Sequence, residues 1–284
     1  MKKDLSVMLA AGGTGGHLFP AFALAEELGR RGIAVDLITD MRGDRYGSGF
    51  PARAVYQVPA ATLASRSPIA AAKTALALAR GTKAAYSIMG KVKPSVVIGF
   101  GGYPSYPPLA AARLRGVPTA VHEQNAVLGR ANRLLAKSVT AIATSFERTK
   151  FLEGPLQAKA KFTGNPVRQA VVEAARRLFE VPIQNGPVNL LVFGGSQGAR
   201  YFADTVPPAL AMLPTDLRSR LRVVQQAREE DLERTKIAYA QSGISAEVAP
   251  FFKDLPARMA AAHLVIGRAG ASTVAELTVI GRPS

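Results

Sequence analysis

Short apolar runs alternate with longer amphipathic stretches along most of the chain. The short runs end at glycine or polar residues, as buried strands do, and the longer stretches repeat apolar residues every three or four positions, as helices do. This alternation is typical of a parallel sheet covered by helices, so we expect an α/β fold. The expected strands are 5–11, 33–39, 96–100, 119–122, 139–144, 188–193 and 264–266, and the expected helices are 20–31, 68–89, 107–115 and 129–137.

A glycine-rich loop follows the first strand in each half of the chain. These loops span residues 12–17 and 194–200, and a helical pattern follows each of them. Glycine lets the backbone approach a ligand closely, and the start of a helix favours anionic oxygens. The repeated order of strand, glycine loop and helix predicts two doubly wound domains facing each other across a cleft, with residues 181–187 as a linker or turn.

Neither loop matches the common nucleotide-binding motifs. A G-x-G-x-x-G pattern that starts at Gly13 has Leu18 in its third glycine position, and no G-x-x-x-x-G-K-[ST] segment occurs. This disfavours a dinucleotide oxidoreductase and a P-loop nucleotidase. The chain has no cysteine, no D-x-D pair and no His/Asp cluster with ligand spacing, so we expect no metal and no cofactor. A tight turn without a ligand remains the alternative for each loop taken alone.

Polar residues follow three of the strands expected in the first half. His17 closes the first glycine loop, residues 101–105 follow one strand, and residues 122–125 follow another. The carboxyl ends of parallel strands share one edge of the sheet, where ligands bind. His17 could accept a proton from a substrate hydroxyl or only cap a helix. Glu123 could orient a histidine, act as a base, or cap a loop.

Three features of the later chain suit a nucleotide diphosphate. Ser196 and the backbone N–H groups of its loop lie at a helix start, and Arg168 could pair with a phosphate. Residues 267–276 follow another strand and give a further loop and helix start. Glu276 in this segment could accept hydrogen bonds from a ribose diol. The alternative is that Glu276 is only an acid in the first turn of a helix, where it interacts favourably with the helix dipole.

Charge divides the chain unevenly. The formal net charge is +16, of which residues 1–180 contribute +14 and residues 181–284 contribute +2. The first half is therefore expected to meet nucleic acid, acidic lipid or a phosphate-bearing substrate. Aromatic residues make up only 7%, and no basic helix stands out, which disfavours nucleic acid. The stretch 68–89 is expected to be an ordinary amphipathic helix, with a membrane-docking surface of apolar and basic residues as the alternative.

Six segments in one order together resemble the MurG family, the UDP-N-acetylglucosamine:N-acetylmuramyl-(pentapeptide) pyrophosphoryl-undecaprenol N-acetylglucosamine transferases. The resemblance covers essentially the whole chain and implies a GT-B fold of two Rossmann-like domains. It implies an acceptor- and membrane-binding domain at 1–165 and a UDP-sugar-binding domain at 166–284, incomplete at its end. The segments are 12–17 with Pro20, 101–105, 122–125, 164–168, 194–200 and 267–276.

The resemblance also implies the reaction. The family moves N-acetylglucosamine from UDP-N-acetylglucosamine to the 4-hydroxyl of the muramyl sugar of undecaprenyl-pyrophosphoryl-MurNAc-pentapeptide, with inversion and without a metal. This converts lipid I to lipid II in peptidoglycan synthesis, which serves cell shape and cell division. The implied location is peripheral, on an anionic surface at the cytoplasmic face of the cell inner membrane. Another GT-B UDP-sugar enzyme, an epimerase or glycolipid synthase, is the alternative.

Site residues follow from the resemblance position by position. His17 is the expected general base on the acceptor hydroxyl, with His122 and Glu123 in reserve. Residues 224–230 lack the histidine-glutamine-glycine pattern of the family, so no role is assigned there, and the segment of the family with a donor-sugar glutamine is expected after Ser284. The implied substrate contacts are Thr14, Gly15 and Gly16 with the donor phosphates and sugar, Tyr103 with the acceptor, Asn125 with the transferred sugar, Arg168 and Ser196 with the diphosphate, the Phe252 backbone with uracil, and Ala271, Ser272, Thr273 and Glu276 with the nucleotide, Glu276 on its ribose.

Overall fold

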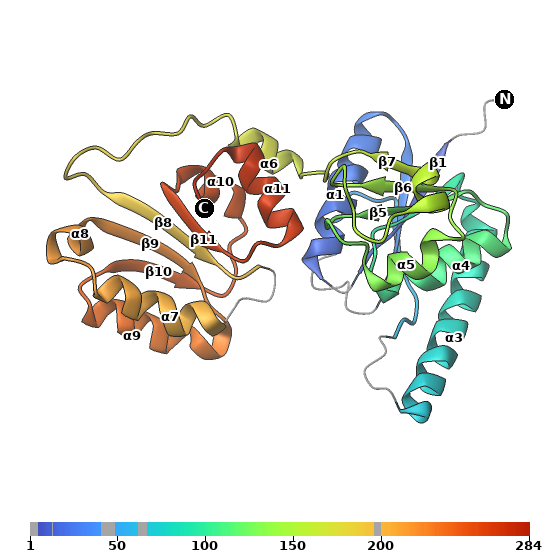
Figure 1. Cartoon of the computed structure of the whole chain (residues 1–284), viewed down its shortest axis with the longest axis horizontal. Helices are drawn as coiled ribbons and strands as arrows, with labels where there is room; N and C mark the ends of the chain where they lie inside the picture. The colour runs from blue at the N-terminus through green and yellow to red at the C-terminus, as the bar shows by residue number, and fades with distance from the viewer. Residues whose placement is uncertain (1–4, 13, 41–48, 62–66, 196–199) are drawn as a thin grey trace. The chain divides into compact units, whose positions relative to one another are not determined.

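The computed structural model describes residues 5–12, 14–40, 49–61, 67–195 and 200–284. The chain forms two compact units, Met1–Arg168 and Gln169–Ser284, and each has its own parallel sheet (Figure 1). This confirms the expectation of two Rossmann-like α/β domains. None of the described helices has the length and hydropathy needed to cross a bilayer.

The sheet of the first unit has seven parallel strands. Each strand is short and mostly apolar, and the chain returns to the same edge through a helix or loop after each one. The spatial order is β3-β2-β1-β4-β5-β6-β7. The strands are β1 (Ser6–Ala10), β2 (Ala34–Thr39), β3 (Ala54–Gln57), β4 (Val96–Gly99), β5 (Thr119–Glu123), β6 (Ala141–Thr144) and β7 (Ala160–Phe162).

Helices cover both faces of this sheet. Side chains alternate across β1, so Val7 and Leu9 pack in a core with α1 (Gly15–Arg30), while Met8 packs in a second core with α3 (Pro68–Val92) and α4 (Tyr106–Leu114). A third core lies under α5 (Arg130–Ala136), near β5 and β6. The short 3-10 helices are η2 (Tyr103–Ser105) and η3 (Gly154–Lys159).

The predicted start of the first helix was wrong. The sequence placed Pro20 in its first turn, but α1 begins at Gly15 and contains Pro20 in its interior. Proline there gives up one backbone hydrogen bond. The earlier start places Leu18 on the buried face together with Ala21, where both pack in the core beneath the helix. His17 therefore lies in the first turn of α1.

The second unit repeats the plan with a four-stranded parallel sheet of order β10-β9-β8-β11. Its core joins Leu190 and Val192 to apolar residues of the helices α7 and α9, which pack against each other. Helices α6, α10 and α11 pack together as a second group. The strands are β8 (Val188–Phe193), β9 (Leu221–Gln226), β10 (Ser245–Ala249) and β11 (Leu264–Gly267), and the helices are α6 (Gln169–Ala174), α7 (Arg200–Ala211), α8 (Thr215–Arg220), η4 (Glu229–Asp231), α9 (Leu232–Gln241), α10 (Leu255–Ala261) and α11 (Ala271–Ile280).

Each sheet contains one point where the strand order reverses. In the first unit β1 lies between β2 and β4, and in the second unit β8 lies between β9 and β11. Connections that leave such neighbouring strands run in opposite directions, which opens a crevice at their carboxyl ends. The glycine loops after β1 and β8 both leave from these points, so the topology places each of them where α/β proteins bind ligands.

Candidate active site

The first glycine loop ends at the start of α1. Thr14 is the N-cap of α1, and its carbonyl oxygen accepts hydrogen bonds from the N–H groups of His17 and Leu18, each at 3.2 Å. Thr14 and Gly16 are exposed, Gly15 is buried, and the first turn contains no acidic residue. The positive end of the helix dipole suits an anionic group.

Gly12 is required by the neighbouring strand β2. A Cβ atom at this position would lie 2.8 Å from Asp40 Oδ1 and 2.9 Å from Thr39 Oγ1. A side chain at position 12 would therefore force either the loop or the side chains of Thr39 and Asp40 to shift. The glycine keeps the loop close to the sheet and so fixes where α1 begins. Gly13, which follows it, lies outside the described residues.

A second glycine turn, Gly101-Gly102, leaves β4 beside the first loop. Both glycines have positive φ, +87° and +70°, a conformation that other residues rarely adopt. Ser105 Oγ lies 2.9 Å from the carbonyl oxygen of Ala10 and 2.7 Å from that of Gly101, so its hydroxyl ties the turn to the end of β1. Tyr103 is half-buried at the start of η2.

The imidazole of His17 rests against this glycine turn. A Cβ atom at Gly101 would lie 3.4 Å from His17 Cε1, and one at Gly102 would lie 3.2 Å from Cδ2 and 3.3 Å from Nε2. On another side of the ring, Nδ1 lies 3.2 Å from Gln124 Oε1. The structure therefore brings together the glycine loop, the Gly101–Ser105 turn and the segment 122–125, as the sequence predicted from their places at strand ends.

His122 is buried, with 4% of its surface exposed. Its Nε2 lies 3.0 Å from the carbonyl oxygen of Gly164, and its Nδ1 lies 3.0 Å from Gln124 Nε2. Burial lowers the pKa of His122, although the hydrogen bond to Gly164 and the charge of Glu123 act in the opposite direction. The neutral imidazole is held on both nitrogens, so His122 connects segments of the site and is less accessible to a substrate than His17.

Glu123 organises the loop that follows β5. Its Oε1 accepts hydrogen bonds from the backbone N–H and the side-chain Nδ2 of Asn125, both at 3.0 Å, and its Oε2 accepts from Gly129 N and Asn132 Nδ2, both at 2.8 Å. The carboxylate is 2% exposed. Four N–H donors on one buried carboxylate favour the loop-capping alternative for Glu123, while Asn125 itself is exposed.

Arg168 lies at the end of the first unit. Its guanidinium carbon is 4.3 Å from the centre of the Phe19 ring, on the first turns of α1. The side chain of Arg168 therefore packs against the first unit. The residue that it contacts, Phe19, follows His17 by two positions in α1. The role of Arg168 in holding a diphosphate stays a prediction.

The second unit places its predicted residues at the carboxyl edge of its own sheet. Arg268, after β11, donates hydrogen bonds from Nε and Nη2 to the carbonyl oxygen of Gly194, after β8. No role was expected for Arg268 from the sequence. It ties together the two loops at the strand-order reversal. Ser196 lies outside the described residues.

Helix α11 presents the predicted nucleotide contacts. Gly270 is its N-cap, and Ala271, Ser272 and Thr273 form its half-buried first turn. Glu276 is the sixth residue of the helix and is 5% exposed. It lies beyond the first turn, so the alternative of a first-turn acid favouring the helix dipole is wrong.

Phe252 is buried beyond the end of β10, with 7% of its surface exposed. The guanidinium carbon of Arg258 lies 4.3 Å from the centre of its ring. This contact holds the ring in place, so only the backbone of Phe252 would be used for the predicted contact with the nucleotide. The contact of that backbone with uracil stays a prediction.

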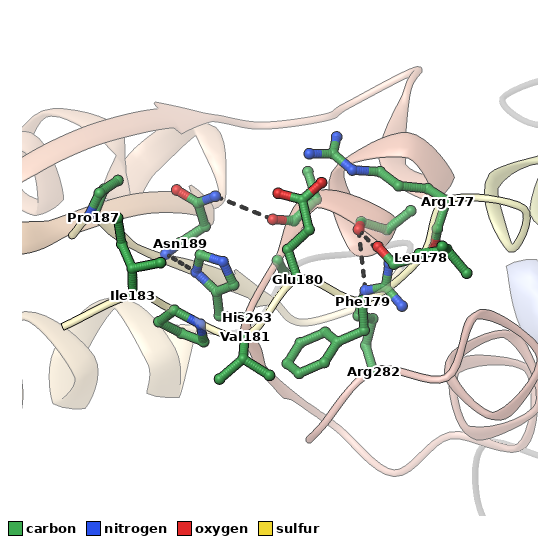
Figure 2. Close-up of a pocket in the computed structure, with 14 residues that line it drawn as sticks. Arg177, Leu178, Phe179, Glu180, Val181, Ile183, Pro187, Asn189, His263 and Arg282 are labelled. Carbon is green, nitrogen blue, oxygen red and sulfur yellow. Dashed lines mark hydrogen bonds between the residues drawn. The ribbon is translucent and has the colours of Figure 1, made fainter.

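A separate hollow of about 250 Å³ lies at the opposite end of the second sheet (Figure 2). It is lined by Asn189, near the start of β8, and by His263, which precedes β11; the backbone N–H of Asn189 donates to His263 Nδ1 at 2.8 Å. Arg282 closes the hollow with hydrogen bonds to several backbone carbonyl oxygens. Because it lies at the amino ends of the strands, it contains none of the predicted site residues.

Comparisons with known proteins agree with this geometry. Residues 7–144 match the glycosyltransferase family 28 N-terminal domain, and residues 189–284 match the glycosyltransferase family 28 C-terminal domain. The chain is 56% identical over 279 residues to the UDP-N-acetylglucosamine--N-acetylmuramyl-(pentapeptide) pyrophosphoryl-undecaprenol N-acetylglucosamine transferase of Methylobacterium sp. (strain 4-46), covering 98% of this chain and 75% of the relative. The crystal structure of Acinetobacter baumannii MurG matches with a TM-score of 0.67 and 31% identity, over 96% of this chain and 74% of that one.

The chain belongs to the MurG family. A UDP-GlcNAc 2-epimerase from Neisseria meningitidis, bound to UDP-GlcNAc, has a TM-score of 0.64 and 15% identity over 98% of this chain and 81% of that one, which shows a shared fold alone. The GT-B fold expected of the MurG-family chain is thereby confirmed. Gln124 and Arg268 lie in segments that the sequence pointed to, 122–125 and 267–276, but neither was expected to have a role of its own; both contact residues distant in the sequence.

Proposed function

We propose that this chain transfers N-acetylglucosamine from UDP-N-acetylglucosamine to the 4-hydroxyl of the muramyl sugar of undecaprenyl-pyrophosphoryl-MurNAc-pentapeptide, with inversion at the sugar anomeric carbon. The product of this step is lipid II, formed from lipid I in peptidoglycan synthesis. The observation that carries the proposal is the cluster around His17, built at the strand-order reversal of the first unit of a MurG-family chain.

In this reaction His17 acts as the general base. Its Nε2 takes the proton of the acceptor hydroxyl while the hydroxyl oxygen bonds to the anomeric carbon of the donor. The bond between that carbon and the phosphate oxygen breaks, and UDP leaves with the electron pair. The helix start at Thr14–Gly16 and the guanidinium of Arg168 favour the negative charge that develops on the leaving diphosphate. No step of this scheme uses a metal, which stays a prediction.

The second unit supplies the nucleotide site. The first turn of α11 offers backbone N–H groups, and Glu276 on the same helix accepts the hydroxyls of the ribose. We assign the uracil edge to the backbone beside Phe252 and the diphosphate to Ser196, as the resemblance to the family implies. The division into an acceptor-binding first unit and a donor-binding second unit follows from these assignments.

The reaction itself is tested by product analysis. We expect the chain, given UDP-N-acetylglucosamine and a lipid I analogue, to release UDP and form a disaccharide with a β-linked N-acetylglucosamine on the muramyl 4-hydroxyl. Linkage is read by nuclear magnetic resonance of the product. Donor incubated without acceptor should stay unchanged. An epimerised sugar nucleotide in that second reaction would contradict the proposal and support a UDP-sugar epimerase.

Membrane association belongs to the same proposal. The N-terminal half of α3 exposes Ile69 (70%) and Leu76 (53%), and the basic side chains of Lys73 and Arg80 are exposed on the same half. Apolar anchors beside basic residues favour peripheral binding to an anionic bilayer surface. The lipid-linked acceptor requires such a surface, and we place the enzyme at the cytoplasmic face of the inner membrane.

The double substitution Ile69→Glu with Leu76→Glu tests this surface. It replaces two insertable side chains with anions, so we expect binding to vesicles that contain anionic lipid to weaken at least about 10-fold. Cosedimentation with the vesicles measures it. The control Met212→Glu changes a side chain that is 87% exposed on the second unit and should leave binding nearly unchanged. Equal losses in both variants would contradict a role for α3.

A further inference from the structure

A continuous line of hydrogen bonds joins His17 to the backbone of Gly164. His17 Nδ1 lies 3.2 Å from Gln124 Oε1, Gln124 Nε2 lies 3.0 Å from His122 Nδ1, and His122 Nε2 lies 3.0 Å from the carbonyl oxygen of Gly164. Gln124 and His122 are 2% and 4% exposed. Gln124 and His122 each have a partner on both sides, so the proton positions along the line can be assigned from its fixed end.

The fixed end is the carbonyl oxygen of Gly164, which can only accept. His122 Nε2 must therefore carry a proton and donate it. A buried histidine in this position is neutral, because burial lowers the pKa of His122. With the proton on Nε2, the other ring nitrogen, Nδ1, carries a lone pair. It accepts a hydrogen bond from the amide nitrogen of Gln124.

The amide orientation of Gln124 is fixed by a second contact. Its Nε2 also donates to the carbonyl oxygen of His122, at 3.0 Å. The flipped amide would place two oxygen atoms 3.0 Å apart and would leave His122 Nδ1 facing an acceptor. Gln124 Oε1 therefore points at His17. Because an amide oxygen only accepts, His17 Nδ1 must carry the proton, and the lone pair of His17 lies on Nε2.

The glycine turn lies next to the Nε2 side of the His17 ring. A Cβ atom at Gly102 would lie 3.3 Å from His17 Nε2, the nitrogen that holds the lone pair. Glycine keeps that nitrogen uncovered by a neighbouring side chain. The ring is thus held by Gln124 at Nδ1 and by the backbone of Gly101-Gly102 along its face, and among the described residues none forms a hydrogen bond with Nε2.

We infer that Gln124 is a positioning residue that sets His17 in the Nδ1–H tautomer and so makes Nε2 the proton acceptor. This inference rests on the proposed role of His17 as the base. During transfer the acceptor hydroxyl gives its proton to Nε2, and the Nδ1–H bond to Gln124 is kept in the resulting imidazolium. A neutral amide does not accept this proton, so it stays on His17 until it exchanges with solvent.

The tautomer can be measured without substrate. The chain has three histidines, so long-range proton–nitrogen spectra of histidine-labelled protein can resolve all of their ring nitrogens. We expect His17 to show a protonated Nδ1 and an unprotonated Nε2, and His122 the reverse. The substitution Gln124→Met, which removes both polar atoms, should convert His17 to a mixture of tautomers. A wild-type His17 protonated at Nε2 would overturn the inference and the assignment of Nε2 as the proton acceptor, whereas the transfer of N-acetylglucosamine is tested separately by product analysis.

Kinetics separate positioning from mere packing. We expect Gln124→Met to lower kcat by about 10- to 100-fold with little change in the KM for UDP-N-acetylglucosamine. Gln124→Glu keeps an acceptor for His17 Nδ1–H but faces the carbonyl oxygen of His122 with a carboxylate. A positioning role predicts that Gln124→Glu is the faster variant and that the acid limb of its pH profile moves to higher pH, since a carboxylate favours the imidazolium.

A packing role predicts the reverse order, because the carboxylate disturbs the buried segment more than methionine does. Gln124→Glu slower than Gln124→Met, with an unmoved acid limb, would overturn the inference. Gln225→Met is the matched control, since Gln225 is also fully buried and its Oε1 accepts the hydroxyl of Tyr239 in the second unit. It should lower stability and leave kcat unchanged.

Discussion

Replacing His17 with alanine is expected to lower kcat for transfer by roughly 10²- to 10⁴-fold, the usual contribution of a general base. The imidazole is the side chain that Gln124 and the Gly101-Gly102 turn together hold, and the substitution removes its Nε2. The donor contacts assigned to the second unit are unchanged. Binding of UDP-N-acetylglucosamine, measured by calorimetry, should therefore stay within a few-fold of wild type.

A matched variant separates the base from the shape of the ring. His17→Gln keeps a polar group against Gln124 but cannot take up a proton at neutral pH, so it should be nearly as slow as His17→Ala. The loss should appear in kcat more than in KM, because the proton is transferred only as the reaction proceeds. Wild-type kcat in either variant would remove His17 from the mechanism.

The second large effect is on stability. Glu123→Ala is expected to lower the free energy of unfolding by about 3 kcal/mol or more, because four N–H donors lose a buried charged acceptor. Urea unfolding measures the change. The loop 124–129 should lose order with it, so the transfer rate per folded molecule should also fall. The four donors belong to Asn125, Gly129 and Asn132. Where water reaches them in the variant, new hydrogen bonds to water offset part of the lost stability.

Glu153→Ala is the control for this substitution. Glu153 is an exposed carboxylate of the same unit, and its removal should change the free energy of unfolding by less than about 0.5 kcal/mol. If Glu123→Ala is as stable as this control and still inactive, the carboxylate acts as a base. From the sequence, Glu123 was expected in this role as an alternative to His17. Lost stability together with lost activity supports its role in ordering the loop.

The buried strands were predictable because their sequences are continuous apolar runs. Val188–Phe193 was predicted with its observed bounds, and β1, β4 and β11 within a residue or two. The strands missed were β3, β7, β9 and β10. Charged exposed residues such as Lys161 in β7 and Arg222 in β9 break the apolar pattern, because a short edge strand or a strand end does not require it.

The site was predictable only to the level of segments. Strand-end position placed His17, the Gly101–Ser105 turn and residues 122–125 at one edge of the sheet, and the structure brings them together. The hydrogen bond between His17 and Gln124 joins residues 107 positions apart, and no periodicity of the sequence reports such a contact. Gln124 has no charge and no reactive atom, so residue chemistry alone also gave no reason to select it.

The pH dependence of kcat/KM tests the central claim, that His17 is the base, most directly. A general base must be unprotonated to accept the proton of the acceptor hydroxyl, so wild-type kcat/KM should fall as the pH is lowered below neutral. The residual kcat/KM of His17→Ala should be flat over the same range. An unchanged acid limb in His17→Ala would assign the titrating base to another group and contradict the account.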